Sequence, residues 1–249
     1  MQTIIPSSSD ALKSLLRADF TTQWKNRRAL IMLLLVPVII LISWKGLVAK
    51  LGGAFVLSTC ITIGLNAIGL MGYANSVARD RDKGVFQRLR VAPVPTWSIM
   101  ISRLSVQLTM IIIVTLLVFV AGFYFDKITI PFTGYALGFL AAILGGAVYL
   151  SIGQTIVGLV KNPETVNVTS RLVYFLFIMI GMFGELGMLG DGIKEAVKWS
   201  PYGTVNRIVS GGLNPDTWTS QTTLALLVTA GYTAIFTTLG IRFFKWSSR

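Results

Sequence analysis

The sequence has no histidine, a single cysteine and few charged residues. Lys, Arg, Asp and Glu make up 13% of its 249 residues, against ~25% in ordinary soluble domains. Without histidine the chain lacks the commonest metal ligand and general base. Cys60 alone cannot form an intramolecular disulfide framework. No serine stands beside a plausible base within an apolar run, so an intramembrane enzyme is not expected.

The sequence also lacks any Gly-Lys pair. A P-loop needs this pair, because its lysine reaches the phosphates of the nucleotide. We therefore expect no cofactor on this chain and no ATP hydrolysis by the chain alone.

Apolar residues dominate what is present. They make up 53% of the chain, and the mean hydropathy is +0.71. This composition indicates an integral membrane protein, in which each helix must cross a hydrocarbon core of ~30 Å. The predicted fold is an all-α integral membrane protein with six transmembrane helices, near residues 29–44, 51–77, 98–125, 132–160, 166–184 and 222–244.

The placement of charge predicts an orientation. A net charge of +12 would suggest nucleic acid in a soluble protein, but here the basic residues gather between the apolar runs. We therefore expect a lipid bilayer and no nucleic acid as partner. With both termini inside, 16 basic residues fall on the inner side and six on the outer side. Since basic residues stay on the cytoplasmic side, we predict cytoplasmic termini in a plasma (inner) membrane.

An amphipathic helix is predicted before the first span. Residues 9–27 place Leu12, Leu16, Phe20 and Trp24 at helical spacing, with charged residues between them. The pattern predicts a helix that lies in the membrane interface, and Trp24 favours this position. A soluble linker helix is the alternative.

Residues 186–219 mix charged residues, prolines and tryptophans, and they are not expected to span the membrane. We interpret them as an extracytoplasmic segment. It is predicted to hold a short interfacial helix before Pro201 and a second one at residues 203–210.

Three polar residues lie within the predicted spans or at their ends. For each of them, the alternatives are a role in helix packing and a role in a transport pathway. Asn66 is expected to form an interhelical hydrogen bond rather than to contact a substrate. Arg171 either extends to the membrane surface or pairs with a neighbouring helix. Glu185 is the only acid near a span, at the span's outer end.

Small residues also recur along the fourth predicted span, where they favour close helix packing. They fall every four residues, at Gly134, Gly138, Ala142 and Gly146.

The longest strongly polar run, residues 73–95, lies between the second and third spans and holds five of the 22 basic residues. Gly84 divides it. After Gly84 we predict a short helix with Phe86 and Leu89 on its apolar side, ending before Pro93. This apolar side is expected to insert into a groove on a partner protein.

The basic residues of the same run are expected to take part in that contact. Arg88 and Arg90 would pair with acids at the rim of the groove. Arg103, in the first turns of the third span, is expected to extend to the cytoplasmic surface. The alternative is a solvated cluster of charges that only orients the chain.

This run resembles the first cytoplasmic loop of ABC-2 type transporter permeases, the membrane subunits of a class of ABC exporters. That loop usually reads Glu-Arg-Glu-x-Gly-Thr, then an acid or amide, a basic residue and leucine, and then a proline. The corresponding residues here are Asp80, Arg81, Asp82, Gly84, Gln87, Arg88, Leu89 and Pro93. Asp replaces Glu twice and Val85 replaces the Thr, so an ion pair at this loop must lie closer to the backbone.

A second part of the chain is similar to the same family. ABC-2 permeases place short re-entrant or interfacial helices between their fifth and sixth spans. They often show a proline, then an arginine and a glycine, and these would be Pro201, Arg207 and Gly211 here.

The resemblance implies that residues 1–249 form one ABC-2 type transmembrane domain, with a cytoplasmic coupling loop at residues 79–95. It implies a complex of two permeases and two ABC ATPase subunits. The second permease would be a copy of this chain or a homologue, and ATP and Mg would bind to the ATPases. The residues implied in coupling are Asp80, Arg81, Asp82, Gly84, Phe86, Arg88, Leu89, Arg90 and Pro93.

The implied function is ATP-driven export. A sparsely charged, aromatic interior favours an amphiphilic substrate, such as a drug-like, lipid or lipid-linked molecule. Polysaccharide export is an alternative within the family. A transporter driven by an ion gradient is a second alternative, but the spans lack buried acids and no inverted repeat is visible.

Overall fold

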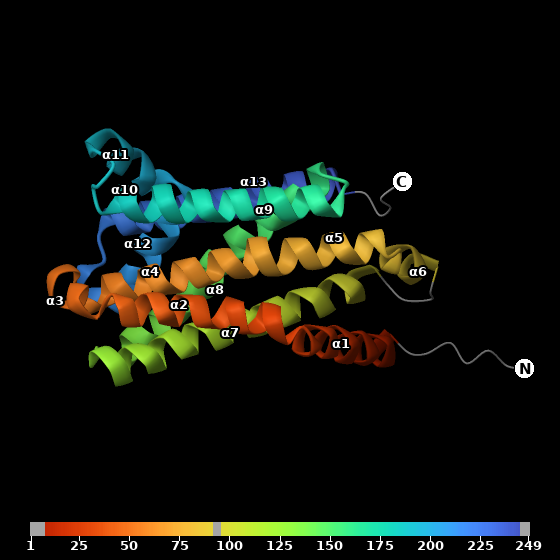
Figure 1. Cartoon of the computed structure of the whole chain (residues 1–249), viewed down its shortest axis with the longest axis horizontal. Coiled ribbons are helices and arrows are strands. Elements are labelled where there is room, and N and C mark those ends of the chain that lie inside the picture. The colour runs from red at the N-terminus through yellow and green to blue at the C-terminus, as the bar shows by residue number, and fades with distance from the viewer. Residues whose placement is uncertain (1–7, 92–95, 245–249) are drawn as a thin grey trace, which may run out of the picture.

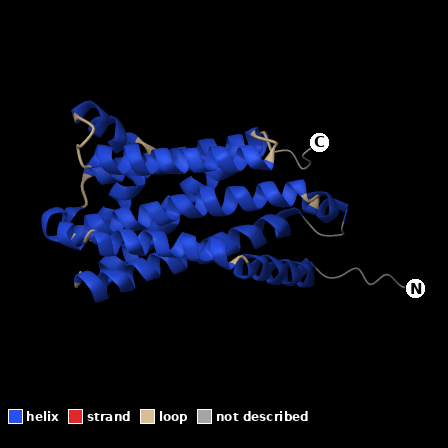
Figure 2. Ribbon diagram, viewed as in Figure 1, coloured by secondary structure: helices blue, strands red, loops and turns tan. Residues whose placement is uncertain are grey.

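The fold was obtained as a computed structural model, which describes residues 8–91 and 96–244. The side chains of residues 8, 28–29, 90–91 and 96–97 are not described. Throughout the described residues, the backbone forms helices joined by short loops, with no strand (Figure 2).

The helices follow one another along the chain with few residues between them. In order they are α1 (Ser8–Lys25), α2 (Arg27–Ser43), η1 (Lys45–Leu47), α3 (Val48–Leu51), α4 (Gly53–Asn66), η2 (Ala67–Ala74), α5 (Asn75–Asp82), α6 (Val85–Val91), α7 (Thr96–Asp126), α8 (Phe132–Leu159), α9 (Pro163–Leu176), η3 (Phe177–Met182), α10 (Phe183–Glu185), α11 (Asp191–Trp199), α12 (Pro201–Leu213), η4 (Pro215–Thr217) and α13 (Ser220–Arg242).

Several of these helices join into membrane-spanning lengths. Within the described residues, five helices are long and apolar enough to cross a bilayer: Gly53–Asp82, Ser98–Asp126, Phe132–Leu159, Pro163–Glu185 and Ser220–Arg242. A sixth crossing arises if α1 and α2, which bend by 61° relative to each other, count as one broken span. The prediction of an all-α membrane protein is confirmed.

The long helices run along a common axis (Figure 1). At one end of the bundle lie α6, the start of α1 and the end of α13; we call this the α6 end. At the opposite end lie α3, α11 and the end of α7. The helix formed by α4, η2 and α5 is the most buried of the five candidate spans. Both η2 and η3 are π-helical turns, which are uncommon within α-helices.

Local sequence explains where several helices begin and end. The Asn162 side chain accepts hydrogen bonds from two backbone N–H groups in the first turn of α9, and Pro163 occupies the first helical position. Ser200 and Pro201 play the same roles for α12. Gly187, with a φ of +75°, closes the end of α10, where few residues other than glycine are comfortable.

The helix α12 is more deeply buried than expected. An interfacial helix was predicted at residues 203–210, but the structure shows a 13-residue helix with ten buried residues. It packs between α4, α8 and α13. This position corrects the interfacial interpretation and agrees with the re-entrant alternative.

Glycines allow the central helices to approach closely. A Cβ atom built on Gly153 of α8 would lie 2.4 Å from the carbonyl oxygen of Gly69 in η2, and one built on Gly69 would lie 2.4 Å from the backbone of Tyr149. The predicted ladder on α8 packs in the same way, with Gly134 and Gly138 against Leu213 of α12. Since lipid tails are as apolar as the core, such close packing contributes much of the association between membrane helices.

We predict that Gly153→Val destabilises the protein strongly. The new side chain would meet backbone atoms that cannot rotate away, and overpacking of this kind costs about 1–3 kcal/mol. The free energy of unfolding can be measured by titrating the purified protein in mild detergent with a denaturing detergent.

Gly231→Val provides the matched control, because no atom lies within 4 Å of a Cβ built at Gly231. Equal stability of the two variants would show that the contact between η2 and α8 does not require a glycine.

Candidate functional site at the α6 end

The coupling loop begins with a tight turn at Gly84. The helix α5 continues the second span to Asp82, and Gly84 then takes a φ of +67°. The N–H of Gly84 donates to the carbonyl of Arg81 at 3.1 Å, and the carbonyl of Gly84 accepts from the N–H of Arg88 in α6. The chain thus reverses between two helices, in a backbone conformation that glycine adopts without strain.

Arg81 is buried just before this turn, with 1% of its surface exposed. Its Nη1 donates to the carbonyl of Val157 at 2.7 Å. Its Nη2 donates to the carbonyls of Val160 and Lys161, each at 2.7 Å. The guanidinium group therefore joins α5 to the end of α8 and to the residues that lead into α9.

The carbonyl groups that bind Arg81 are free to accept these bonds because α8 ends at Leu159. The last four carbonyls of a helix have no intrahelical donor, and Pro163 has no N–H to offer. The end of a helix also carries partial negative charge, which favours a cation. A hydrogen bond to a charged group contributes about 1.5–3 kcal/mol. Removing Arg81 would take this donor from one buried and two partly buried carbonyls.

A second arginine joins three helices at the same end. Arg103 of α7 forms a salt bridge with Asp80 of α5, with 2.8 Å between Nη2 and Oδ2. Its guanidinium carbon lies 4.6 Å from the ring centre of Phe86 in α6, a favourable cation–π position. The expectation that Arg103 extends to the surface was wrong, because only 10% of its side chain is exposed.

The apolar side of α6 faces its own chain. Phe86 is 1% exposed, and its ring packs edge-on against Phe244, with 5.7 Å between the ring centres. Leu89 is partly buried against the same core. The prediction that Phe86 inserts into a partner protein is therefore corrected. Among the described side chains of residues 82–89, those of Asp82, Lys83, Gln87 and Arg88 are exposed.

For two residues of the predicted coupling set, the structure describes no side chain. Pro93 lies outside the described residues, and the side chain of Arg90 is not described. Their proposed part in coupling stays a prediction.

The N-terminal helix α1 packs against α7. The hydroxyl of Ser102 donates to the carboxylate of Asp19 at 2.5 Å. Of the apolar residues predicted for the interface, Leu12, Leu16 and Phe20 are partly buried, whereas Trp24 is exposed. Three of the four apolar residues are thus partly covered in a helix that packs on α7, and Trp24 remains available to lipid.

A second polar cluster lies near the opposite end of the bundle. Asn206 of α12 donates from Nδ2 to Glu185 of α10 at 2.5 Å and to the hydroxyl of Thr59 in α4 at 3.4 Å. Asn206 and Thr59 are each 1% exposed. The sequence pointed to Glu185 but not to its partners, because residues 203–210 were interpreted as a surface helix.

The other two polar candidates have different surroundings. Asn66 donates from Nδ2 to the carbonyl of Tyr174 in α9 at 3.3 Å, which confirms the interhelical hydrogen bond. Arg171 is exposed on α9. Asn66, Arg171 and Glu185 are thus placed in three separate environments and form no common site.

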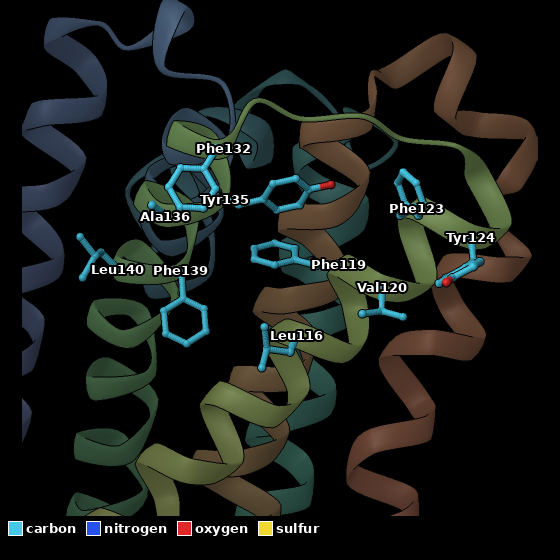
Figure 3. A pocket seen from close by; sticks show the side chains of 10 residues that line it. All are labelled: Leu116, Phe119, Val120, Phe123, Tyr124, Phe132, Tyr135, Ala136, Phe139 and Leu140. Atoms are coloured by element: carbon cyan, nitrogen blue, oxygen red, sulfur yellow. The ribbon is translucent and has the colours of Figure 1, made fainter.

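A wide apolar groove lies between α7 and α8 near the end opposite α6 (Figure 3). Its volume is about 720 Å³. In Figure 3 aromatic rings from both helices line the groove, and Phe119 packs edge-on against Tyr135 with 5.0 Å between ring centres. The groove is lined by Leu116, Phe119, Val120, Phe123, Tyr124, Phe132, Tyr135, Ala136, Phe139 and Leu140.

The α6 end presents an exposed charged surface on a buried framework of hydrogen bonds and edge-on aromatic rings. Among the described residues, no group of three or more His, Cys, Asp or Glu side chains could hold a metal ion.

Comparison with known families decides the identity. A model of the family described as ABC-2 family transporter protein matches residues 45–242. The chain belongs to this family. No curated protein matches the sequence.

As a member of this family, the chain is the membrane component of an ABC transporter. The matched residues include α6, Arg81 and Arg103. The match begins after α2, so the contact between α1 and α7 lies partly outside it.

We predict that Asp80 and Arg103 are energetically coupled. A double-mutant cycle with Asp80→Asn and Arg103→Gln should give a coupling energy of at least about 1 kcal/mol, because the pair is largely shielded from water. The measurement is the free energy of unfolding of the detergent-purified single and double variants.

The control pair is Glu195 and Lys198 on α11, whose side chains are 64% and 37% exposed. An exposed pair three residues apart on a helix contributes only about 0.2–0.5 kcal/mol. A coupling energy at Asp80–Arg103 no larger than that of the control would contradict a structural role for the buried pair.

Proposed function

We propose that the chain is the permease subunit of an ABC exporter and that an ABC ATPase, on a separate chain, docks on the α6 end. The observation that carries this proposal is the construction of the coupling loop. The exposed residues of the Gly84 turn and α6 lie next to buried side chains that contact three spans, through α5, α7 and α8. A force applied to this surface therefore reaches α5, α7 and α8 directly.

The docking surface is polar. Lys83, Gln87 and Arg88 are exposed on the turn and α6, and they offer donors to acids on an ATPase. Phe86 supports this contact indirectly, because its ring packs inside the chain against Arg103 and Phe244 and so holds α6 in place. Coupling then depends on buried packing in this chain and on a charged contact with the partner.

The substrate is an amphiphile in this proposal. The groove between α7 and α8 offers an aromatic, almost wholly apolar surface that suits a drug-like, lipid or lipid-linked molecule. Export of a polysaccharide remains the alternative within the family. One observation favours a transporter driven by an ion gradient, namely the carboxylate of Glu185 bound by Asn206 between helices. A single acid without a second ionic partner gives this alternative less support.

Two permease chains are expected to form one pathway. The spans Pro163–Glu185 and Ser220–Arg242 bury the smallest share of their residues among the five candidate spans. The helix formed by α9 and η3 exposes large apolar residues at Val168, Leu172, Phe175 and Ile180. A second copy or a homologous permease would cover part of this surface, and lipid would cover the rest.

The α6 end is placed in the cytoplasm, where ATP is available. The described parts of the chain begin and end at this same end of the bundle (Figure 1). This arrangement agrees with cytoplasmic termini in the plasma (inner) membrane and with the excess of basic residues on that side.

The function is tested by joining the permease with an ABC ATPase from the same organism. We predict that Gly84→Val lowers transport per ATP hydrolysed in the reconstituted complex. A branched residue at a φ of +67° costs roughly 1–2 kcal/mol of strain, so the turn should change shape and α6 should shift. Transport of a fluorescent amphiphile and ATP hydrolysis are measured in the same vesicles.

Gly192→Val is the matched control, since Gly192 lies on α11 with no atom within 4 Å of a Cβ built there. Two outcomes would overturn the proposal. One is ATP hydrolysis by the isolated chain free of contaminants, and the other is normal transport per ATP in Gly84→Val.

We also predict the orientation of the chain in cells. In a variant with Cys60→Ala, a cysteine at Asp216 should react with a membrane-impermeant thiol reagent applied outside. A cysteine at Lys83 should react only after the membrane is opened. Both positions are exposed, so access rather than burial decides the result. The reverse pattern would refute cytoplasmic termini.

A further inference from the structure

A second cytoplasmic connection is joined to the coupling loop through Arg81. The short turn between α8 and α9, residues 160–162, is more than 75 positions away in sequence. Arg81 reaches three carbonyls in this region, two of them from the turn itself. Among the arginines whose side chains the structure describes, only Arg81 is seen to make three hydrogen bonds to backbone carbonyls.

We infer that Arg81 is a positioning residue that holds the turn between α8 and α9 against the coupling loop, and that both connections together form the docking surface for the ATPase. The identity of the partner rests on the proposed function. The fixed relation between the two connections rests on the hydrogen bonds of this chain alone.

The geometry of the contact supports this role. The two Nη atoms bind carbonyls from the last turn of α8 and from the residues after it. A guanidinium group has a rigid fork of donors, so the direction of each bond is set by the plane of the group. A lysine carries the same charge but cannot place its donors in this way.

The turn also presents its own exposed groups. Lys161, Asn162 and Glu164 are exposed, and the backbone of the turn is fixed on one side by Arg81 and on the other by the Asn162 side chain. These residues lie at the same end of the bundle as α6 (Figure 1). An ATPase that contacts α6 therefore meets a second, independently charged surface whose position Arg81 determines.

Hydrogen exchange of the isolated permease tests the internal part of the inference. The variants are Arg81→Gln and Arg81→Lys, and the matched control is Arg79→Gln, whose side chain is exposed two residues away on α5. Exchange at residues 158–166 should become about tenfold faster in both Arg81 variants, because neither glutamine nor lysine has the guanidinium fork that binds three carbonyls at once. Exchange in α11, at the opposite end, should remain unchanged.

The contrast between the two Arg81 variants separates geometry from charge. Protection restored by lysine would show that charge alone holds the turn, and it would overturn the inference. So would exchange at residues 158–166 that is equal in Arg81→Gln and Arg79→Gln. If Arg81→Gln does not fold, the comparison between Arg81→Lys and Arg79→Gln gives the same decision.

The docking part is tested in the complex with the ATPase, with Arg81 intact. Spin labels at Arg79 and Thr165, which are exposed and lie outside the proposed contact residues, report the distance between the two connections in a chain with Cys60→Ala. This distance should stay constant when ATP is added, and Lys161→Glu should weaken binding of the ATPase several-fold. A label distance that changes with ATP, or binding unaffected by Lys161→Glu, would contradict a common docking surface.

Failure of the proposed function would give a different experimental result from failure of the inference about Arg81. If no ABC ATPase binds the permease, the assembly measurement fails, while the exchange measurement still decides whether Arg81 holds the turn.

Discussion

The last carbonyl groups of a helix have no donor within the helix, and the buried ones must be paired elsewhere in the protein. At the end of α8 and just after it, the guanidinium of Arg81 binds three carbonyls at once. These bonds join α5 to the end of α8 directly before the chain turns at Gly84. The orientation of α6 then follows from the packing of Phe86 between Arg103 and Phe244.

The two ends of the bundle are held by different interactions. At the α6 end, arginines bind carbonyls, an acid and an aromatic ring. Towards the other end, glycines on α8 allow α12 to enter between the spans, and Asn206 supplies hydrogen bonds to Glu185 and Thr59. Strong charged contacts at one end and close neutral packing at the other give the spans different resistance to separation along their length.

Much of the fold was predictable from the sequence. Long apolar runs located the spans, since membrane helices differ from loops in composition alone. The fifth span was predicted from residue 166, whereas α9 begins three residues earlier at Pro163 because Asn162 caps its first turn. Gly84 was expected to divide the polar run, and its positive φ forms the turn between α5 and α6.

The site was less predictable, because its contacts join residues far apart in sequence. The resemblance to ABC-2 permeases selected Arg81 but gave no partner, which lies 76–80 positions away. The apolar side of α6 was recognised, yet periodicity cannot tell whether such a side meets its own chain or another protein. Phe244, which decides this point, stands at the end of the last span. In the same way, Asn206 could not be assigned to Glu185 while its helix was placed at the surface.

The shared location of α6 and both described chain ends has a consequence for gene fusion. An ATPase domain encoded in the same reading frame, before α1 or after α13, would emerge on the side of the bundle where α6 lies. It would reach that surface without an added membrane crossing. The separation of permease and ATPase into two polypeptides is therefore not required by this fold, and a single-chain transporter could arise by fusion at either end.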